Sequence, residues 1–105
     1  MNQYSASAAE ILTGALQDAN RAVVVGMPTF GKGTVNRLQP LSNGGALLYS
    51  YARWYTPSGN LIEGLGLEPD VKIPQSPNLQ PGAIDQQLEK ALDLIKSEIL
   101  VPGSN

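Results

Sequence analysis

Two residues in this sequence have side chains suited to nucleophilic chemistry. Ser7 lies in the motif Ser-Ala-Ser-Ala-Ala-Glu, and Lys32 lies in the motif Phe-Gly-Lys-Gly. The chain contains no histidine and no cysteine, so it cannot form a Ser-His-Asp triad or a Cys-His pair from its own residues. If the chain contributes nucleophilic catalysis, a serine is the nucleophile and a lysine is the remaining candidate base.

Each of these side chains would need a particular environment. Serine is a weak nucleophile that needs a base, and a lysine can serve as that base only when desolvation keeps it neutral. Lys32 lies between two glycines after an apolar run, so we expect a buried, closely packed setting for it. Ser7 precedes a predicted helix, where the backbone N–H of Ala8 could stabilise an oxyanion. No second oxyanion donor is evident in the chain.

The same residues also have simpler explanations. Ser7 and Glu10 have the Ser-x-x-Glu spacing of a capping box, and spacing alone favours a helix cap for Ser7. By the same argument, Glu10 is expected to cap the helix and not to transfer protons. Gly31-Lys32-Gly33 could be a solvated turn or a phosphate-binding loop, although Gly-x-x-x-x-Gly-Lys-Ser/Thr is absent. Ser5 is a rival nucleophile in a predicted loop.

An αβ unit is predicted to position these residues. Apolar residues recur at helical spacing after Ser7, which predicts a helix from about Ala6 to Asp18. The β-branched run Ala22–Gly26 then predicts a strand buried on both faces of a parallel sheet. Lys32 follows this strand in a loop rich in turn residues.

The rest of the sequence alternates short strands with turns before a closing helix. The Asn-Gly-Gly sequence is a strong hairpin signal, because these residues tolerate positive φ. The expected elements are strands Thr34–Leu41 and Ala46–Tyr55 joined by the turn Ser42–Gly45, a turn at Thr56–Gly59, a brief strand at Val71–Ile73, a linker at 75–82, and an amphipathic helix from about Ala83 to Leu100. Arg53, Trp54 and Tyr55 are expected to pack along a strand and not to contact substrate.

The composition bounds the possible functions. The chain has 105 residues, which suits one domain, or a piece of one, with a single modest core. Its net charge is −2 and its seven Lys and Arg residues are scattered, which argues against nucleic-acid binding. Only 15% of residues are charged, and so few surface charges can indicate a buried interface. No apolar run approaches the roughly 20 residues needed to span a bilayer, and no leader pattern opens the chain.

Several motifs, in the same order, resemble those of the C-terminal processing peptidases, also called tail-specific proteases. The matching segments are Asn2–Leu16, Ala22–Gly26, Pro28–Val35, Ala52–Gly59, Gly64–Val71 and Gln87–Leu92. The resemblance implies that Ser7 is the nucleophile and Lys32 is its general base. Asn36 occupies the place where the family often has a glutamine that orients the base. Asn36 keeps the amide but is one methylene shorter.

The resemblance also implies a fold and a context. The fold would be α/β, the C-terminal part of a crotonase-like (ClpP/crotonase) peptidase core, with residues 1–105 lacking the upstream αβ units and the PDZ domain that engages substrate C-termini. The parent would be a serine endopeptidase of the bacterial periplasm or cell envelope that cuts proteins near nonpolar C-termini without a metal or cofactor. The isolated chain would be inactive or nearly so, and it would self-associate through its open strand edge.

Two other functions are consistent with the same residues. One is a non-catalytic peptide-binding or scaffolding module in which Asn36 reflects a decayed site. The other is an acyl-group enzyme of the related crotonase-like architecture, for which the sequence carries no coenzyme A motif. An activated serine probe would leave Ser7 unlabelled in the first case.

Overall fold

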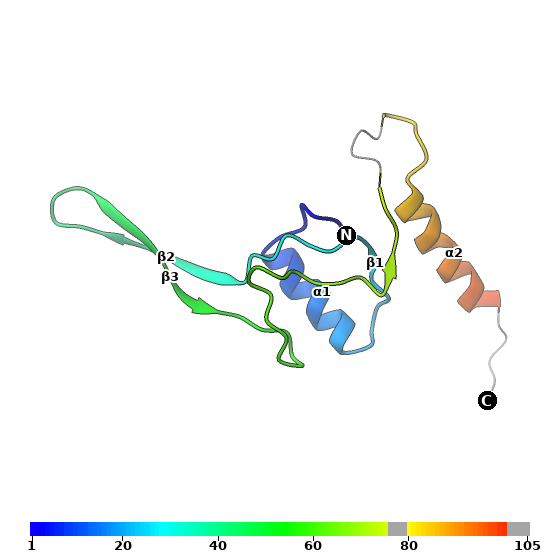
Figure 1. Cartoon of the computed structure of the whole chain (residues 1–105), viewed down its shortest axis with the longest axis horizontal. Helices are drawn as coiled ribbons and strands as arrows, with labels where there is room; N and C mark the ends of the chain where they lie inside the picture. Colours follow the sequence, from blue (N-terminus) through cyan, green and yellow to red (C-terminus); the bar gives the residue numbers. More distant parts are fainter. Residues whose placement is uncertain (76–79, 101–105) are drawn as a thin grey trace.

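The computed structural model describes residues 1–75 and 80–100 and places the N-terminal helix at the centre of the molecule (Figure 1). This helix, α1, spans Ala8–Asp18, so it begins two residues after the predicted start. The two residues of the predicted capping box flank the first turn, where Ser7 N–H donates to Glu10 Oε2 at 2.8 Å and the Ser7 side chain makes no cap hydrogen bond. The sequence therefore identified the helix and the cause of its start.

A two-stranded parallel sheet lies beside α1. Strand β1 spans Val25–Gly26 and pairs with β4, which spans Val71–Lys72, so the predicted parallel pairing is confirmed. On the other side of β1, the N-terminal amino group of Met1 donates to the Val25 carbonyl at 2.8 Å, and Met27 N–H donates to the Met1 carbonyl at 3.0 Å.

The prediction of a doubly buried strand over Ala22–Gly26 was wrong in extent. Only its last two residues are paired, and Val23 is 54% exposed. A β-branched run forms a strand only where neighbouring backbone supplies hydrogen-bond partners. Here β4 is two residues long and Met1 is the neighbour on the other side, so most of the run lacks a partner strand within the described residues.

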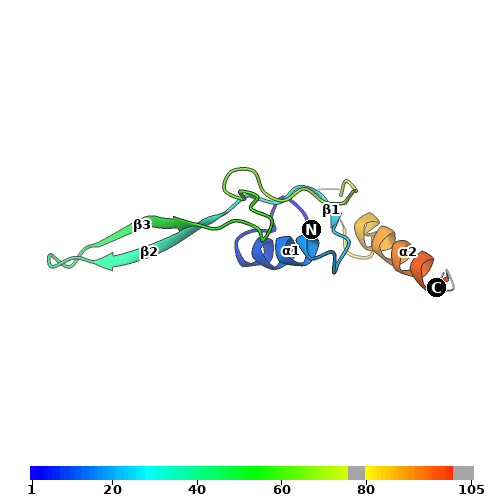
Figure 2. The same ribbon diagram turned by 90° about the horizontal axis from the view of Figure 1, so that it is seen from below.

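The predicted hairpin is confirmed. Strand β2 spans Thr34–Pro40 and β3 spans Ala46–Arg53, and the two pair antiparallel with an irregularity between Val35 and Asn36. The turn places Gly44 at φ 84°, and Leu41 N–H donates to the Gly45 carbonyl at 2.9 Å. Figures 1 and 2 show the hairpin extending away from α1 on the side opposite α2. Nearly all of its residues are exposed.

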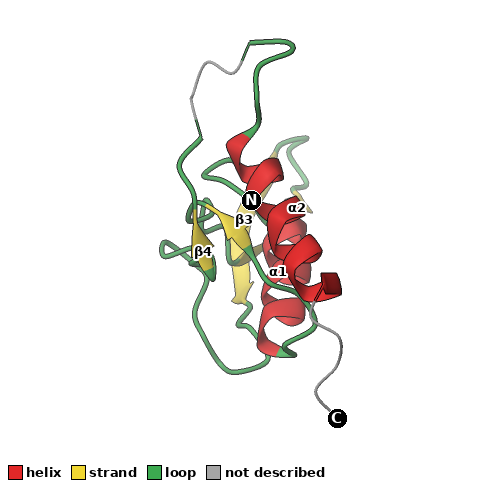
Figure 3. Ribbon diagram, turned by 90° about the vertical axis from the view of Figure 1, so that its right-hand side faces the viewer, coloured by secondary structure: helices red, strands yellow, loops and turns green. Residues whose placement is uncertain are grey.

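The second helix, α2, spans Gln86–Leu100 and begins three residues later than predicted. Its start is set by Asp85, whose Oδ1 accepts hydrogen bonds from the backbone N–H groups of Gln87 (3.0 Å) and Leu88 (3.1 Å). Gln87 Nε2 donates to the Ile73 carbonyl at 2.9 Å, which ties α2 to the chain just after β4. In Figure 3 both helices lie to one side of β4. Neither described helix has the length and apolarity needed to cross a membrane.

The buried core is smaller than the chain length predicted. Among the described residues, Val24, Ile62 and Leu67 are the buried hydrophobic side chains. The radius of gyration is 18.2 Å, against about 13 Å for a compact domain of this length. Between β3 and β4, the predicted turn at Thr56–Gly59 is confirmed, with Gly59 N–H donating to the Thr56 carbonyl at 2.8 Å. Residues 76–79 of the expected linker lie outside the described residues.

Candidate active site at the start of α1

Ser7 stands at the N-cap of α1 in an unusual backbone conformation. Its φ is 56° and its ψ is −118°, and the only other positive-φ residue besides glycine in the described part of the chain is Asn20. An ordinary N-cap residue has extended, β-region dihedrals, so capping does not require this geometry. Residues held in such sparsely populated conformations store strain and cluster at functional sites.

Glu10 joins Ser7 to the loop that carries Lys32. Its carboxylate is fully buried, and Oε2 accepts hydrogen bonds from the backbone N–H groups of Ser7 (2.8 Å) and Lys32 (2.9 Å). Oε1 accepts from Thr29 Oγ1 at 2.5 Å and from Gly31 N–H at 2.6 Å. Two residues separated by 25 positions therefore share one carboxylate oxygen, which places their backbones next to each other.

The Glu10 carboxylate is held in its charged form. Burial raises the pKa of Glu10, but hydrogen bonds from Thr29, Gly31, Lys32 and Ser7 together outweigh it and leave the pKa below its ordinary value of 4.5. Among the described residues, the ion pair that forms joins Lys72 to Glu68, and no cation pairs with Glu10. Four hydrogen-bond donors, and not a positive side chain, compensate the buried charge.

Both glycines beside Lys32 are required by close backbone packing. Gly31 has φ 87°, and a Cβ there would lie 2.8 Å from the Gly66 nitrogen. Gly33 N–H donates to Glu63 Oε2 at 2.6 Å, and a Cβ on Gly33 would lie 2.5 Å from the Glu63 nitrogen. The loop backbone is therefore buried, as the Gly-Lys-Gly motif indicated.

The Lys32 side chain itself is exposed, so the predicted burial of this lysine was wrong for residues 1–105. Its backbone N–H is fixed by Glu10, but nothing in the described part of the chain covers the side chain. The glycines indicated a crowded backbone, and that crowding does not extend to the side chain between them.

The other candidates differ in how they lie relative to this pair. Asn36 lies exposed on β2 and its Oδ1 accepts a hydrogen bond from Ser50 Oγ at 2.7 Å; among the described residues, no hydrogen bond joins it to Lys32. Ser5 lies in the loop before α1, where its carbonyl accepts from Phe30 N–H at 3.0 Å and its hydroxyl accepts from Asn2 N–H at 3.2 Å. Ala8, the proposed oxyanion donor, is the first residue of α1.

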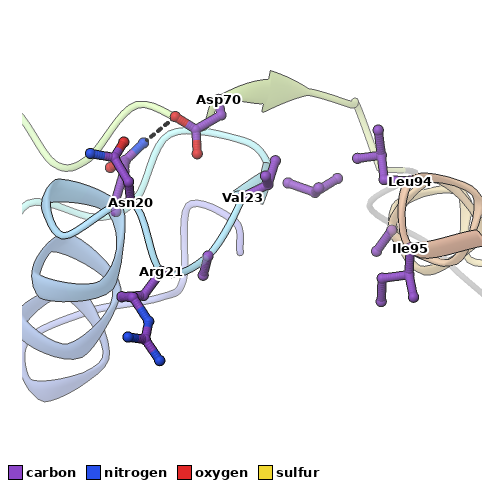
Figure 4. Close-up of a pocket in the computed structure, with 10 residues that line it drawn as sticks. Asn20, Arg21, Val23, Asp70, Leu94 and Ile95 are labelled. Carbon is purple, nitrogen blue, oxygen red and sulfur yellow. Dashed lines mark hydrogen bonds between the residues drawn. The ribbon is translucent and has the colours of Figure 1, made fainter. Parts of the chain in front are cut away.

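A pocket of about 620 Å³ lies at the opposite end of α1 (Figure 4). It is lined by Gln17, Asn20, Arg21, Ala22, Val23, Val25, Asp70, Ala91, Leu94 and Ile95. Gln17 Nε2 donates to Asp70 Oδ1 at 2.9 Å, and Val24 N–H donates to Asp70 Oδ2 at 2.7 Å, so these polar groups already have partners. Within residues 1–75 and 80–100, histidine, cysteine and acidic side chains form no group of three that could hold a metal ion.

Comparisons with known proteins identify relatives of this chain. The sequence profile of Peptidase family S41 matches residues 1–73. A carboxy-terminal-processing protease of Bartonella bacilliformis is 49% identical over 75 residues, and a probable CtpA-like serine protease of Staphylococcus aureus is 48% identical over 73 residues. These matches cover 71% and 70% of this chain but only 17% and 15% of the two relatives.

Solved structures are similar to this chain as well. The photosystem II D1 C-terminal processing protease superimposes with a TM-score of 0.68 at 36% identity, covering 88% of this chain and 22% of that protein. Mature CPAF superimposes with a TM-score of 0.61 at 25% identity, covering 93% of this chain and 19% of that protein. The α/β arrangement is therefore shared with C-terminal processing protease structures over nearly the whole chain.

Proposed function

Because this chain belongs to Peptidase family S41, we propose that it supplies the nucleophile Ser7 and the general base Lys32 to a serine endopeptidase. The observation that carries the proposal is the pairing of a strained serine at a helix N-terminus with a lysine whose backbone is bound to the same buried carboxylate oxygen. A helix cap and a solvated turn would account for Ser7 and Lys32 separately, but they would not require this shared contact.

In the proposed reaction, neutral Lys32 takes the proton of the Ser7 hydroxyl as Oγ attacks the carbonyl carbon of the scissile peptide bond. The Ala8 N–H, at the positive end of the α1 dipole, donates to the oxyanion that forms. Lys32 then gives its proton to the leaving amine as the C–N bond breaks and an ester to Ser7 remains. Lys32 then deprotonates a water molecule as it attacks the ester, and passes that proton to Ser7 Oγ as the C–O bond to the enzyme breaks.

Residues 1–105 supply only part of this machinery. We propose that upstream αβ units of a crotonase-like core provide the second oxyanion donor and cover Lys32, whose side chain needs desolvation to be neutral. An upstream PDZ domain would engage nonpolar protein C-termini, outside the bacterial cytoplasm. To orient Lys32, the Asn36 side chain would have to give up the hydrogen bond that it accepts from Ser50 and form one with Lys32 instead. The isolated chain would therefore have little or no activity.

The proposal is tested in a chimera in which this chain replaces the segment of the Bartonella bacilliformis relative to which it aligns. Ser7→Ala and Lys32→Arg should each lower kcat for an unstructured protein by at least about 100-fold, because arginine keeps the charge but cannot act as a base. Ser5→Ala is the matched control and should leave kcat close to that of the unmodified chimera. Full activity of Ser7→Ala would refute the proposal.

The non-catalytic module is the second candidate, and the exposure of Lys32 is the observation that favours it. It predicts that the chimera binds peptides but does not cleave them, with or without Ser7→Ala. Cleavage that depends on both Ser7 and Lys32 would exclude it.

A further inference from the structure

The buried carboxylate of Glu10 does more than a capping box requires. A capping box needs one hydrogen bond from the N-cap N–H to this side chain, and it works at a solvent-exposed helix end. Glu10 instead has no exposed surface and accepts four hydrogen bonds, three of them from backbone N–H groups. Removing a carboxylate from water is costly unless its hydrogen-bonding capacity is filled, and here it is filled.

The four donors come from two segments that the reaction must hold together. One is the Ser7 N–H at the start of α1, and the other is the Thr29–Lys32 loop after β1. Thr29 extends the link further, because its hydroxyl donates to Glu10 and accepts a 2.7 Å hydrogen bond from Leu67 N–H. Glu10 thus joins the start of the helix to the lysine loop, and Thr29 joins that loop to the segment before β4.

We infer that Glu10 is a positioning residue of the serine–lysine site: its buried carboxylate holds Ser7 in its strained conformation and fixes the Lys32 backbone through the same oxygen. This inference rests on the proposed roles of Ser7 and Lys32. Without the Ser7 N–H···Oε2 hydrogen bond, Ser7 is free to relax to the extended dihedrals of an ordinary N-cap. Such a change would alter the direction in which Ser7 Oγ leaves the backbone.

The hydrogen-bond geometry makes a glutamine at position 10 a sharp test. Each oxygen of Glu10 accepts from two groups, so in either amide orientation the NH₂ of a glutamine meets at least one backbone N–H, although the Thr29 hydroxyl can turn to accept from it. Glu10→Gln therefore keeps the shape of the side chain and loses at least one of the four contacts, the one from Gly31 N–H or those from Ser7 N–H and Lys32 N–H. Glu10→Asp keeps the charge, but it is one methylene shorter and cannot reach both segments at the same distances.

In the chimera described above, Glu10→Gln should lower kcat by about 100-fold with KM little changed, because a misplaced nucleophile slows chemistry more than binding. Glu68→Gln, the same change at an exposed position, should leave kcat unaltered. Fluorophosphonate labelling of Ser7 should slow by the same factor as kcat in the Glu10→Gln chimera. A reduced level of folded protein alone would lower the labelled fraction without slowing the labelling of the folded remainder.

The outcomes separate this inference from the proposed function. A folded Glu10→Gln chimera with kcat near that of the parent would overturn the positioning role, provided that Ser7→Ala is inactive. An active Ser7→Ala chimera would overturn the proposed function itself. If Glu10→Gln does not fold, the same constants are measured for Glu10→Asp, for which unchanged kcat would overturn the inference and a large loss at constant KM would support it.

Discussion

At the scale of single residues, Ser7 combines a helix N-terminus with a backbone conformation that side chains generally avoid. Its φ of 56° and ψ of −118° suit glycine better than any other residue. The Ser7 backbone is held on both sides: its N–H donates to Glu10 Oε2 at 2.8 Å, and its carbonyl accepts from the N–H groups of Glu10 and Ile11. Residues kept in such conformations cluster at functional sites, which is consistent with the proposed role of Ser7.

Substitution of Ser7 should separate strain from chemistry. Ser7→Gly removes the steric penalty, so we expect it to be about 1 kcal/mol more stable than Ser7→Ala, which keeps the penalty. Both variants lack the hydroxyl and should be equally inactive in the chimera. The measurement is the free energy of unfolding in urea for both variants of this chain. A Ser7→Gly variant less stable than Ser7→Ala would show that the positive φ carries no strain.

The lowered pKa of Glu10 predicts a loss of stability in acid. Above pH 4.5 the Glu10 carboxylate is charged in the folded and the unfolded chain, and its stabilising contribution is fully present. As the pH falls below 4.5, Glu10 binds a proton in the unfolded chain before it does in the folded chain. Its contribution to the free energy of unfolding therefore decreases, and it is lost once the pH has fallen below the lowered pKa of the folded chain. The urea midpoint of the wild-type chain should therefore fall over this range more steeply than that of Glu10→Gln.

The comparison with Glu10→Gln isolates this one carboxylate. Hydrogen bonds from Thr56 and Ser58 lower the pKa of Asp18 as well, and that residue contributes equally to both proteins. Parallel pH dependences for the wild type and Glu10→Gln would contradict the charged, buried state of Glu10.

At the scale of elements, the lysine loop depends on tight backbone contact, and a matched pair of glycines tests this. Gly31 and Gly59 have nearly the same φ, 87° and 88°, but a Cβ on Gly31 would lie 2.8 Å from the Gly66 nitrogen while a Cβ on Gly59 meets nothing within 4 Å. Gly31→Ala should destabilise the chain by clearly more than the roughly 1 kcal/mol expected for Gly59→Ala. Equal unfolding midpoints for the two variants would mean that the loop is not packed as described.

Local patterns in the sequence predicted most elements but not all of their bounds. The Ser-x-x-Glu spacing identified the start of α1, and the Asn-Gly-Gly turn identified the hairpin, because both signals act within a few residues. The start of α2 was placed too early because the apolar pattern begins at Ile84, whereas Asp85 provides the cap. The length of β1 depends on its neighbours and could not be read from its own residues.

The sequence pointed to Ser7 and Lys32 as candidates but not to the carboxylate that joins their backbones. Ser7 and Lys32 were identified, but Glu10 was assigned only a capping role, because its other partners lie about 20 positions away in the chain. The one available signal was Thr29 with Gly31 and Gly33, a set of small residues that permits close approach to a buried group. Their spacing does not reveal which group approaches.

At the scale of the whole molecule, the chain is elongated and exposes much of its apolar surface. Ile11, Leu12 and Leu16 on α1 are 49%, 63% and 39% exposed, and the hairpin contacts no other described element. Exposed apolar surface of this kind marks an interaction surface. We expect the isolated chain to self-associate, so light scattering at high concentration should give a mass above 11.1 kDa. A monomeric mass would contradict this expectation.

The central claim is that Ser7 is a nucleophile activated by Lys32, and covalent labelling of the chimera tests it most directly. A fluorophosphonate probe reacts with an activated serine, with loss of fluoride, and mass spectrometry of the digested protein locates the modified residue. The account predicts modification of Ser7, none in Ser7→Ala, and a rate lowered at least about 100-fold in Lys32→Arg. Modification of another serine, or an unchanged rate in Lys32→Arg, would contradict it.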